Sequence, residues 1–141
     1  VIGSGRDYLS AIICIRYSVL SKWAENKRIG FTTYSDLANK TEIESLITSE
    51  TKKVNDTLPD KQRIKKFVLL YKEFDADDDE LTRTKKLRRN FVIKKYSDIV
   101  EALYGDKKTI DINTSVKLQD GGVQKINTKL NIINMENING I

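Results

Sequence analysis

The ten residues from Glu80 to Arg89 carry the side chains best suited to chemistry. They read Glu-Leu-Thr-Arg-Thr-Lys-Lys-Leu-Arg-Arg and place two hydroxyls and five cations before an expected amphipathic helix. Cations are unfavourable at a helix N-terminus, because the peptide dipoles already place partial positive charge there. Backbone N–H groups of a first helical turn bind phosphate or carboxylate oxygens, and a nearby lysine adds a mobile positive charge. The pattern favours an anionic ligand, whereas the simpler interpretation is a solvated basic face.

This segment resembles the C-terminal lysine motif of long-chain fatty acyl-CoA synthetases, members of the adenylate-forming superfamily. That motif reads Leu-Thr-x-Thr-x-Lys-Leu-(Lys/Arg)-Arg, and residues 81–89 match it. The similarity extends upstream through residues 65–70, 73–75 and 77–78, and downstream through Arg89, Phe91, Tyr96 and residues 101–104. In the family, the motif lies on a small mobile lid domain. Relatives tend to have glycine where Asp79 stands, so we expect a less tight turn there.

The resemblance implies roles for individual residues of the motif. Lys86 matches the lid lysine that enters the active site for adenylation, so it is the candidate catalytic residue, and Lys85 stands where relatives often have an uncharged residue. A desolvated lysine near the α-phosphoryl oxygens would stabilise the charge that accumulates there. Further positioning or nucleotide-binding roles are implied for Thr82, Arg83, Thr84, Lys85, Arg88 and Arg89.

The resemblance also implies substrates and a partner. The intact enzyme would use ATP, Mg²⁺ and CoA to convert a fatty acid into its acyl-CoA thioester. Its large N-terminal AMP-binding domain, with the nucleotide-binding motifs and the hinge, would lie upstream of Val1 in the same polypeptide. We expect this part alone to be inactive and to bind no cofactor, and we predict no metal ligand in it.

Composition limits the alternatives. The 141 residues suit one modest domain, and the net charge of +5 with a pI near 9.2 favours anionic partners without choosing among them. The sequence contains no histidine, so histidine-based triads and metal sites are excluded within it. Cys14 is the single cysteine and is expected to be a buried apolar residue in a reducing cytosolic setting. No apolar run is long enough for a membrane span, which predicts a soluble cytoplasmic chain and leaves peripheral membrane contact open.

The patterning predicts an α+β fold, with a small antiparallel or mixed sheet of about three strands flanked by helices, plus a C-terminal β-hairpin. A turn at Gly3-Ser4-Gly5 should lead into a strand over residues 8–15, and a second strand is expected over 63–72. Helices are expected over residues 18–28 with Gly30 as the stop and over 36–39 with Ser35 as N-cap.

Two longer helices are expected further along the chain. The first covers residues 41–58, with a Thr41–Glu44 capping box, Pro59 as terminator and an apolar face that includes Val54. The second covers 86–104, with a kink near 97–98. Its buried stripe should turn Lys86 outward, and it is formed by Leu87, Phe91, Tyr96, Ile99, Val100 and Leu103.

The last third of the sequence predicts a hairpin. Apolar residues alternate over 110–118 and over 126–132, and a three-residue loop at 120–122 would pair Val116 with Ile126 and Ile112 with Leu130. We therefore assign residues 1–105 to an N-terminally truncated lid domain, 106–133 to its hairpin extension, and 134–141 to a loose tail.

Two non-catalytic interpretations stay open. One is a nucleic-acid-binding module, although it lacks a known motif and its basic segments contain few aromatic residues. The basic residues that this module would use are Lys61, Arg63, Lys65, Lys66, Lys85, Lys86, Arg88 and Arg89. The other interpretation is a docking domain that uses the hairpin face.

The aspartate-rich segment 75–80 is a weak candidate for a calcium site. Glu80 and Lys86 stand where an EF-hand needs glycine and glutamate.

Overall fold

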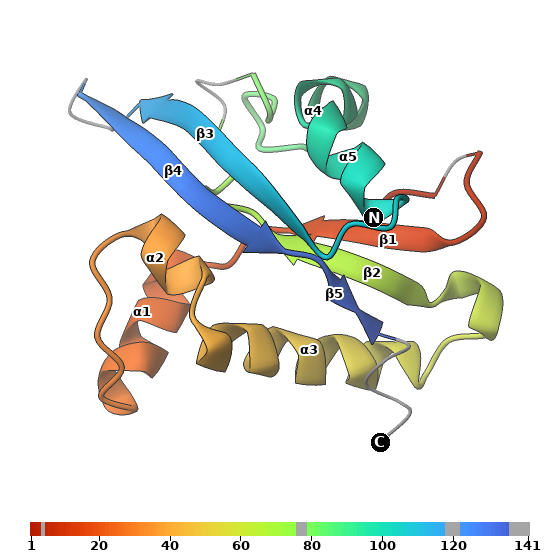
Figure 1. Cartoon of the computed structure of the whole chain (residues 1–141), viewed down its shortest axis with the longest axis horizontal. Coiled ribbons are helices and arrows are strands. Elements are labelled where there is room, and N and C mark those ends of the chain that lie inside the picture. The colour runs from red at the N-terminus through yellow and green to blue at the C-terminus, as the bar shows by residue number, and fades with distance from the viewer. Residues whose placement is uncertain (4, 76–78, 118–121, 136–141) are drawn as a thin grey trace.

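A three-stranded mixed sheet with helices on both faces forms the centre of the molecule (Figure 1). The computed structural model describes residues 1–3, 5–75, 79–117 and 122–135. Strand β1 (Leu9–Ile13) runs parallel to β2 (Ile64–Leu69), and β2 pairs antiparallel with β5 (Ile133–Asn134). Strands β3 (Thr109–Lys117) and β4 (Val123–Asn131) form a separate antiparallel hairpin. The predicted α+β fold is confirmed.

Helices connect these strands. Between β1 and β2 the chain forms α1 (Tyr17–Asn26), α2 (Tyr34–Ala38), α3 (Thr41–Asn55) and the short 3₁₀ helix η1 (Asp60–Gln62). Helices α4 (Arg89–Lys95) and α5 (Ser97–Leu103) follow β2 and lie on the face of the sheet opposite to α1, α2 and α3 (Figure 1). They are separated at Tyr96, so the predicted kink occurs one residue earlier than expected. No helix in the described part of the chain is long and apolar enough to cross a membrane.

Strand β2 contributes side chains to two hydrophobic cores, one on each face of the sheet. Successive side chains of a strand point to opposite faces. Phe67 and Leu69 therefore pack with α1, α2 and α3, whereas Val68 packs with α4, α5 and β4. Because both faces are covered, β2 has the continuous apolar run that predicted a strand in this region. Ile126 and Leu130 of β4 join the second core, so the hairpin packs on the sheet.

The N-terminal turn forms where the glycines predict it. Ile2 and Ser10 exchange backbone hydrogen bonds of 2.7 and 2.9 Å in an isolated antiparallel bridge, and Gly5 has a φ of 71°. The middle residue of the predicted turn, Ser4, lies outside the described residues.

Three predicted helix signals were wrong in detail. Arg28, rather than Gly30, adopts the left-handed conformation after α1 (φ 59°), and the amide of Ile29 bonds to the carbonyl of Ala24 at 2.8 Å. The hydroxyl of Thr33, rather than Ser35, caps α2 by accepting from the amide of Asp36 at 3.1 Å. In α3, Thr41 is already helical and Lys40 is the N-cap without a side-chain bond, so the predicted capping box does not form.

The end of α3 also differs from the prediction. The helix ends at Asn55, whose side chain bonds the amide and carbonyl of Ile64 at 3.0 and 2.9 Å and so ties α3 to the start of β2. Val54, predicted on the apolar face, is 53% exposed. Pro59 stands before η1 instead of terminating α3.

The hairpin register is shifted by two residues from the prediction. Ile110 opposes Leu130 and Thr114 opposes Ile126. A shift of two keeps every side chain on its predicted face, so alternation alone cannot distinguish the two registers. The observed register also places Asp111 opposite Lys129, with 3.9 Å between the carboxylate and the ammonium. Most of the predicted loop, at 120–121, lies outside the described residues.

The predicted loose tail begins too early. Asn134 belongs to β5, and Met135 is buried in the core under α1, α2 and α3. Residues 136–141 lie outside the described residues. The division into a lid domain over residues 1–105 and a hairpin extension that begins at 106 stays a prediction.

Glu44 gives a testable pH dependence. Burial raises the pKa of its carboxyl, and the amide of Asn131 at the end of β4, which donates to it at 2.8 Å, partly opposes this. A raised folded-state pKa means that the charged form costs stability above that pKa and that the cost disappears on acidification. We expect Glu44→Gln to raise the free energy of unfolding at pH 7, by less than about 1 kcal/mol because the carboxylate is only partly buried.

Urea titrations at pH 7 and near pH 3 measure this effect. Glu42→Gln is the matched control, because Glu42 is exposed in the same first turn of α3. The difference in the free energy of unfolding between Glu44→Gln and Glu42→Gln should vanish near pH 3. A difference that grows at this pH would contradict the raised pKa of Glu44.

Candidate functional site: the lysine loop

The segment predicted to carry chemistry forms a closed loop between β2 and α4. We call residues 81–88 the lysine loop. Its two ends meet in an isolated antiparallel bridge between Leu81 and Leu87. The amide of Arg88 also donates to the carbonyl of Glu80 at 2.9 Å, so both strands of the loop are joined at the base.

Thr82 organises the interior of the loop. Its amide donates to the carbonyl of Lys86 at 2.8 Å, and its hydroxyl accepts from the amide of Lys86 at 3.0 Å. Its carbonyl accepts from the amide of Lys85 at 2.9 Å, which closes a turn over Arg83 and Thr84. The hydroxyls of Thr82 and Thr84 lie 3.1 Å apart. The two threonines, which both precede the lysines, thus fix the turn that leads into Lys85 and Lys86.

Two left-handed residues shape the loop. Asp79 has a φ of 63° and Lys85 a φ of 62°. Such backbone costs non-glycine residues energy, aspartate less than most, so the remaining contacts must hold it in place. Asp79 thus adopts a conformation that glycine adopts freely.

Lys86 is exposed, but not for the reason predicted. We expected Leu87 and Phe91 to share a buried helix stripe that turned Lys86 outward. Helix α4 begins only at Arg89, and Leu87 is 46% exposed. The bridge between Leu81 and Leu87, rather than a helix, sets the path of the backbone at Lys86. Among the described residues, no ion pair holds the Lys86 ammonium.

The arginines at the end of the loop have partners within the chain. A guanidinium nitrogen of Arg88 bonds the carbonyl of Asp79 at 3.1 Å and lies 3.7 Å from its carboxylate. Arg89 donates to the carbonyl of Val1 at 2.8 Å. Helix α4 begins only at Arg89, so Lys85 and Lys86 precede it and do not belong to its first turn.

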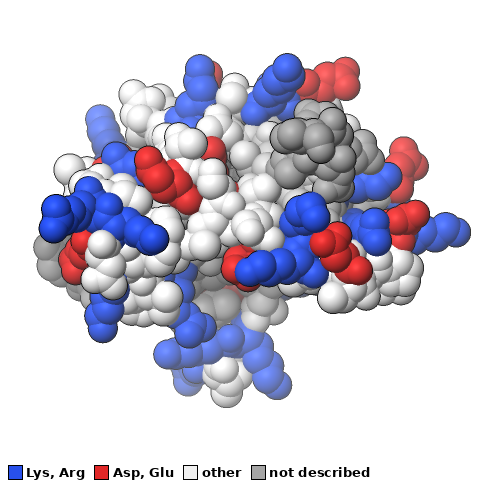
Figure 2. All heavy atoms as spheres, turned by 90° about the horizontal axis from the view of Figure 1, so that it is seen from below, with Lys and Arg blue, Asp and Glu red and all other residues white. Residues whose placement is uncertain are grey.

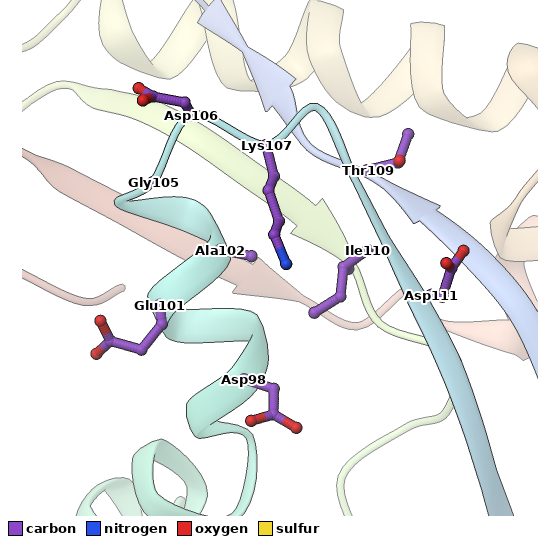
Figure 3. A pocket seen from close by; sticks show the side chains of 9 residues that line it. All are labelled: Asp98, Glu101, Ala102, Gly105, Asp106, Lys107, Thr109, Ile110 and Asp111. Atoms are coloured by element: carbon purple, nitrogen blue, oxygen red, sulfur yellow. The ribbon is translucent and has the colours of Figure 1, made fainter.

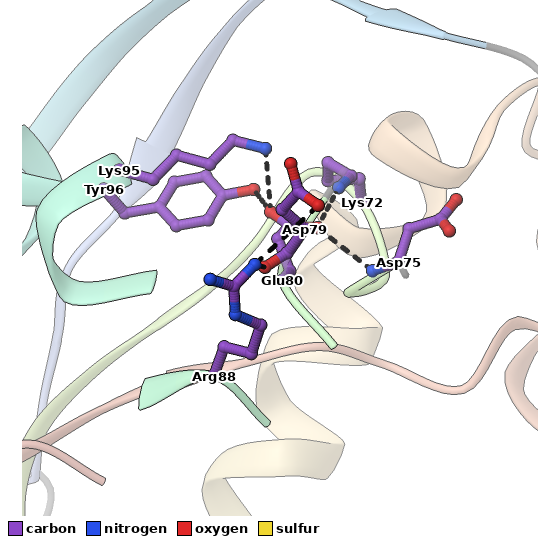
Figure 4. A network of polar contacts seen from close by, with 7 residues as sticks. All are labelled: Lys72, Asp75, Asp79, Glu80, Arg88, Lys95 and Tyr96. Atoms are coloured by element: carbon purple, nitrogen blue, oxygen red, sulfur yellow. Dashed lines mark hydrogen bonds and ion pairs between the residues drawn. The ribbon is translucent and has the colours of Figure 1, made fainter. Parts of the chain in front are cut away.

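Sequence reasoning missed the group beneath the loop, a buried polar network centred on Glu80 (Figure 4). Glu80 is 0% exposed. One carboxylate oxygen accepts from the Lys72 ammonium and from the amide of Asp75 at 3.0 Å. The other accepts from the Tyr96 hydroxyl and lies 3.2 Å from the Lys95 ammonium. A glutamate that follows three consecutive aspartates looks like a solvated loop residue, so only the fold reveals its burial.

Two ionisable side chains in and near this network, Tyr96 and Cys14, have raised pKa values, mainly because of burial. Burial, and then the hydrogen bond to Glu80, raise the pKa of Tyr96, so its hydroxyl stays protonated and can donate. Cys14, predicted to be buried, is only partly buried, and burial raises the pKa of its thiol to about 12, as is usual for a packed cysteine rather than an activated nucleophile.

Comparisons with known proteins show which enzymes the chain is similar to. The chain is 29% identical over 105 residues to the long-chain-fatty-acid–CoA ligase FadD15 of Mycobacterium tuberculosis, a match that covers 74% of this chain and 18% of that protein. The curated proteins that match this chain include several long-chain fatty-acid–CoA ligases. FadD15 of Mycobacterium bovis matches to the same extent. The ligase ACSBG2 of Gallus gallus is 42% identical over 48 residues, covering 34% of this chain and 6% of its own.

The resemblance inferred from the motif is thereby confirmed. The chain spans about 18% of the length of FadD15. No family model matches the chain. No solved structure matches it either.

The basic residues of the nucleic-acid alternative do not all gather at one place. Lys61, Arg63 and Lys65 line a hollow beside Asp7 and Asp60, and no residue of the lysine loop lines it. Figure 2 shows Lys and Arg side chains in separate groups on one face, with Asp and Glu side chains between them. A phosphate backbone would meet both signs of charge there, so this arrangement does not favour that alternative.

A larger hollow of about 700 Å³ lies between α5 and β3 (Figure 3). Four carboxylates line it, with Lys107 as the single cation. Its charge is opposite to what a nucleotide or CoA would need. This hollow therefore does not favour an anionic ligand. The carboxylates are those of Asp98, Glu101, Asp106 and Asp111.

Proposed function

We propose that this chain is the C-terminal domain of a long-chain fatty-acid–CoA ligase and that Lys86 is its lid lysine. The observation that carries the proposal is the form of the lysine loop. It presents an exposed ammonium on a backbone that threonine hydrogen bonds and a buried carboxylate hold in place. The homology to FadD15 and ACSBG2 supports the reaction class.

The proposed reaction has two steps. In the first, a fatty-acid carboxylate oxygen attacks the α-phosphorus of ATP, the bond to the bridging oxygen breaks, and pyrophosphate leaves. In the second, the CoA thiolate attacks the acyl carbon and AMP leaves. Lys86 acts in the first step, where its ammonium stabilises the negative charge on the α-phosphoryl and bridging oxygens.

The other loop residues have supporting roles in this proposal. Thr82 and Thr84 hold the turn, and Lys85 takes up the left-handed position before Lys86. Arg83 is exposed at the tip and is available to a phosphate or a facing domain. Arg88 and Arg89 already bond Asp79 and Val1, so they can reach a phosphate only by exchanging those contacts.

The nucleotide, CoA and acyl sites belong, in this proposal, to a larger N-terminal domain of the same polypeptide. Mg²⁺ would neutralise triphosphate charge there. The described residues contain no group of three or more metal-ligating side chains that could hold an ion, and we assign no metal ligand to this chain.

Acyl-CoA formation tests the proposed function. The full-length polypeptide, a version lacking residues 1–141 of the present numbering, and the present chain alone are each incubated with palmitate, ATP, Mg²⁺ and CoA. We expect palmitoyl-CoA and AMP from the full-length polypeptide only. A truncated version that keeps full activity, or a full-length polypeptide that forms ADP instead of AMP, would contradict the proposal.

A further inference from the structure

The buried carboxylate of Glu80 has four partners within the chain. Two ammonium groups, a tyrosine hydroxyl and a backbone amide converge on it, from three separate parts of the chain. Lys72 lies just after β2, Asp75 in the segment that follows, and Tyr96 with Lys95 at the end of α4. Glu80 therefore ties the segment before the lysine loop to the helix after it.

The backbone of Glu80 is equally committed. Its amide donates to the carbonyl of Asp75 at 3.1 Å, and its carbonyl accepts from the amide of Arg88 at 2.9 Å. Leu81, the next residue, forms the bridge that closes the loop. Side chain and backbone together fix the point from which the lysine loop extends, six residues before Lys86 in the chain.

We propose that Glu80 is a positioning residue for Lys86. Its carboxylate fixes the base of the lysine loop against β2 and α4, so that the exposed ammonium is presented in one orientation. This inference rests on the proposed function for the role of Lys86. The ordering of the loop by Glu80 is independent of that function. Positioning matters because a small misplacement of a group that stabilises the transition state lowers the rate strongly.

Substituting glutamine tests the charge with little change of shape. Glu80→Gln replaces the buried carboxylate that accepts from Lys72 and Tyr96 by a neutral amide of similar shape, so these charge-assisted contacts are weakened. Glu101→Gln is the matched control, because Glu101 also accepts a cationic partner, Arg6 at 2.7 Å, but is exposed on α5. Circular dichroism first establishes that each variant is folded.

The first readout does not depend on catalysis. Trypsin can cleave the lysine loop after Arg83, Lys85, Lys86 and Arg88. On the present chain, we expect cleavage in this loop to be about tenfold faster for Glu80→Gln than for Glu101→Gln, because loops that open locally are cut more often. Equal cleavage rates in folded variants would overturn the proposal.

The second readout asks whether Glu80 acts through Lys86. In the full-length polypeptide, we expect Glu80→Gln to lower kcat of adenylation about tenfold with KM for ATP nearly unchanged. When Lys86 is already alanine, the same substitution should change the rate less than about twofold, because residues that act as one unit are not additive. If Glu80→Gln lowered kcat by the same factor with and without Lys86, the effect would be a general structural one and the proposal would be overturned.

A third variant covers the case in which Glu80→Gln does not fold. Tyr96→Phe removes one donor to Glu80 and keeps the ring packed near Tyr71 and Phe74. It should also speed cleavage of the loop, by a smaller factor, and unchanged cleavage would count against the proposal. Full adenylation activity in Lys86→Ala alone would overturn the proposed function, and the trypsin comparison would then decide the ordering of the loop by itself.

Discussion

Replacing Lys86 by alanine in the full-length polypeptide is expected to slow adenylation about a hundredfold. Loss of one preorganised donor to a developing oxyanion typically costs about 3 kcal/mol, which corresponds to that factor in rate. Lys86 is exposed on a loop whose backbone bonds do not involve its side chain, so the fold should survive the substitution. Pyrophosphate exchange into ATP measures the first step, and thioester formation from supplied palmitoyl-adenylate measures the second.

The two steps should respond differently. Thioester formation should change only a few-fold, because the charge that Lys86 stabilises develops during adenylation. Equal losses in both steps would indicate a general defect and contradict the assignment.

Lys85 needs its own control, because it is adjacent and also cationic. Alanine is unsuitable there, since the φ of 62° favours glycine or asparagine. Lys85→Asn should leave adenylation within a few-fold of the unmodified enzyme, and so should Lys94→Ala, which removes an exposed cation of α4. If Lys85→Asn cost as much as Lys86→Ala, Lys85 would be the better candidate.

The elements of this fold that are governed by local pattern could be predicted from the sequence. The apolar run of β2 and the stripe through Tyr96, Ile99 and Leu103 correctly located a buried strand and a kinked helical segment. These patterns work because burial repeats with the period of the element. The motif of residues 81–89 likewise indicated the homology, although a helix rather than a loop was predicted from residue 86.

The details that failed depend on contacts between distant residues. Leu87 fits the helical stripe by spacing, but its backbone pairs with Leu81 before the helix begins. The hairpin register has two solutions with identical faces, and Asp111 opposite Lys129 distinguishes them only once the strands are paired. The burial of Glu80 could not be predicted, because its partners Lys72 and Tyr96 lie on elements whose proximity the sequence does not show.

The largest effect on stability is expected at Phe67. Its side chain is 0% exposed, and its backbone lies between Ala11 of β1 and Ile133 of β5 in the middle of the sheet. Phe67→Ala would leave a cavity against α1, α2 and α3, and such substitutions typically cost about 3–5 kcal/mol in the free energy of unfolding. That is a large part of the usual stability of a domain, so urea unfolding of the present chain should shift to a midpoint lower by roughly 2 M.

Val54 provides the contrasting test, because sequence pattern and structure disagree about it. The apolar stripe of α3 predicted that Val54 is a core residue, whereas the structure leaves it more than half exposed. Val54→Ala should therefore change the free energy of unfolding by no more than about 0.5 kcal/mol, as is usual for surface positions. A cost for Val54→Ala close to that of Phe67→Ala would mean that α3 packs with a different face, and the assignment of the core between α3 and β2 would then be wrong.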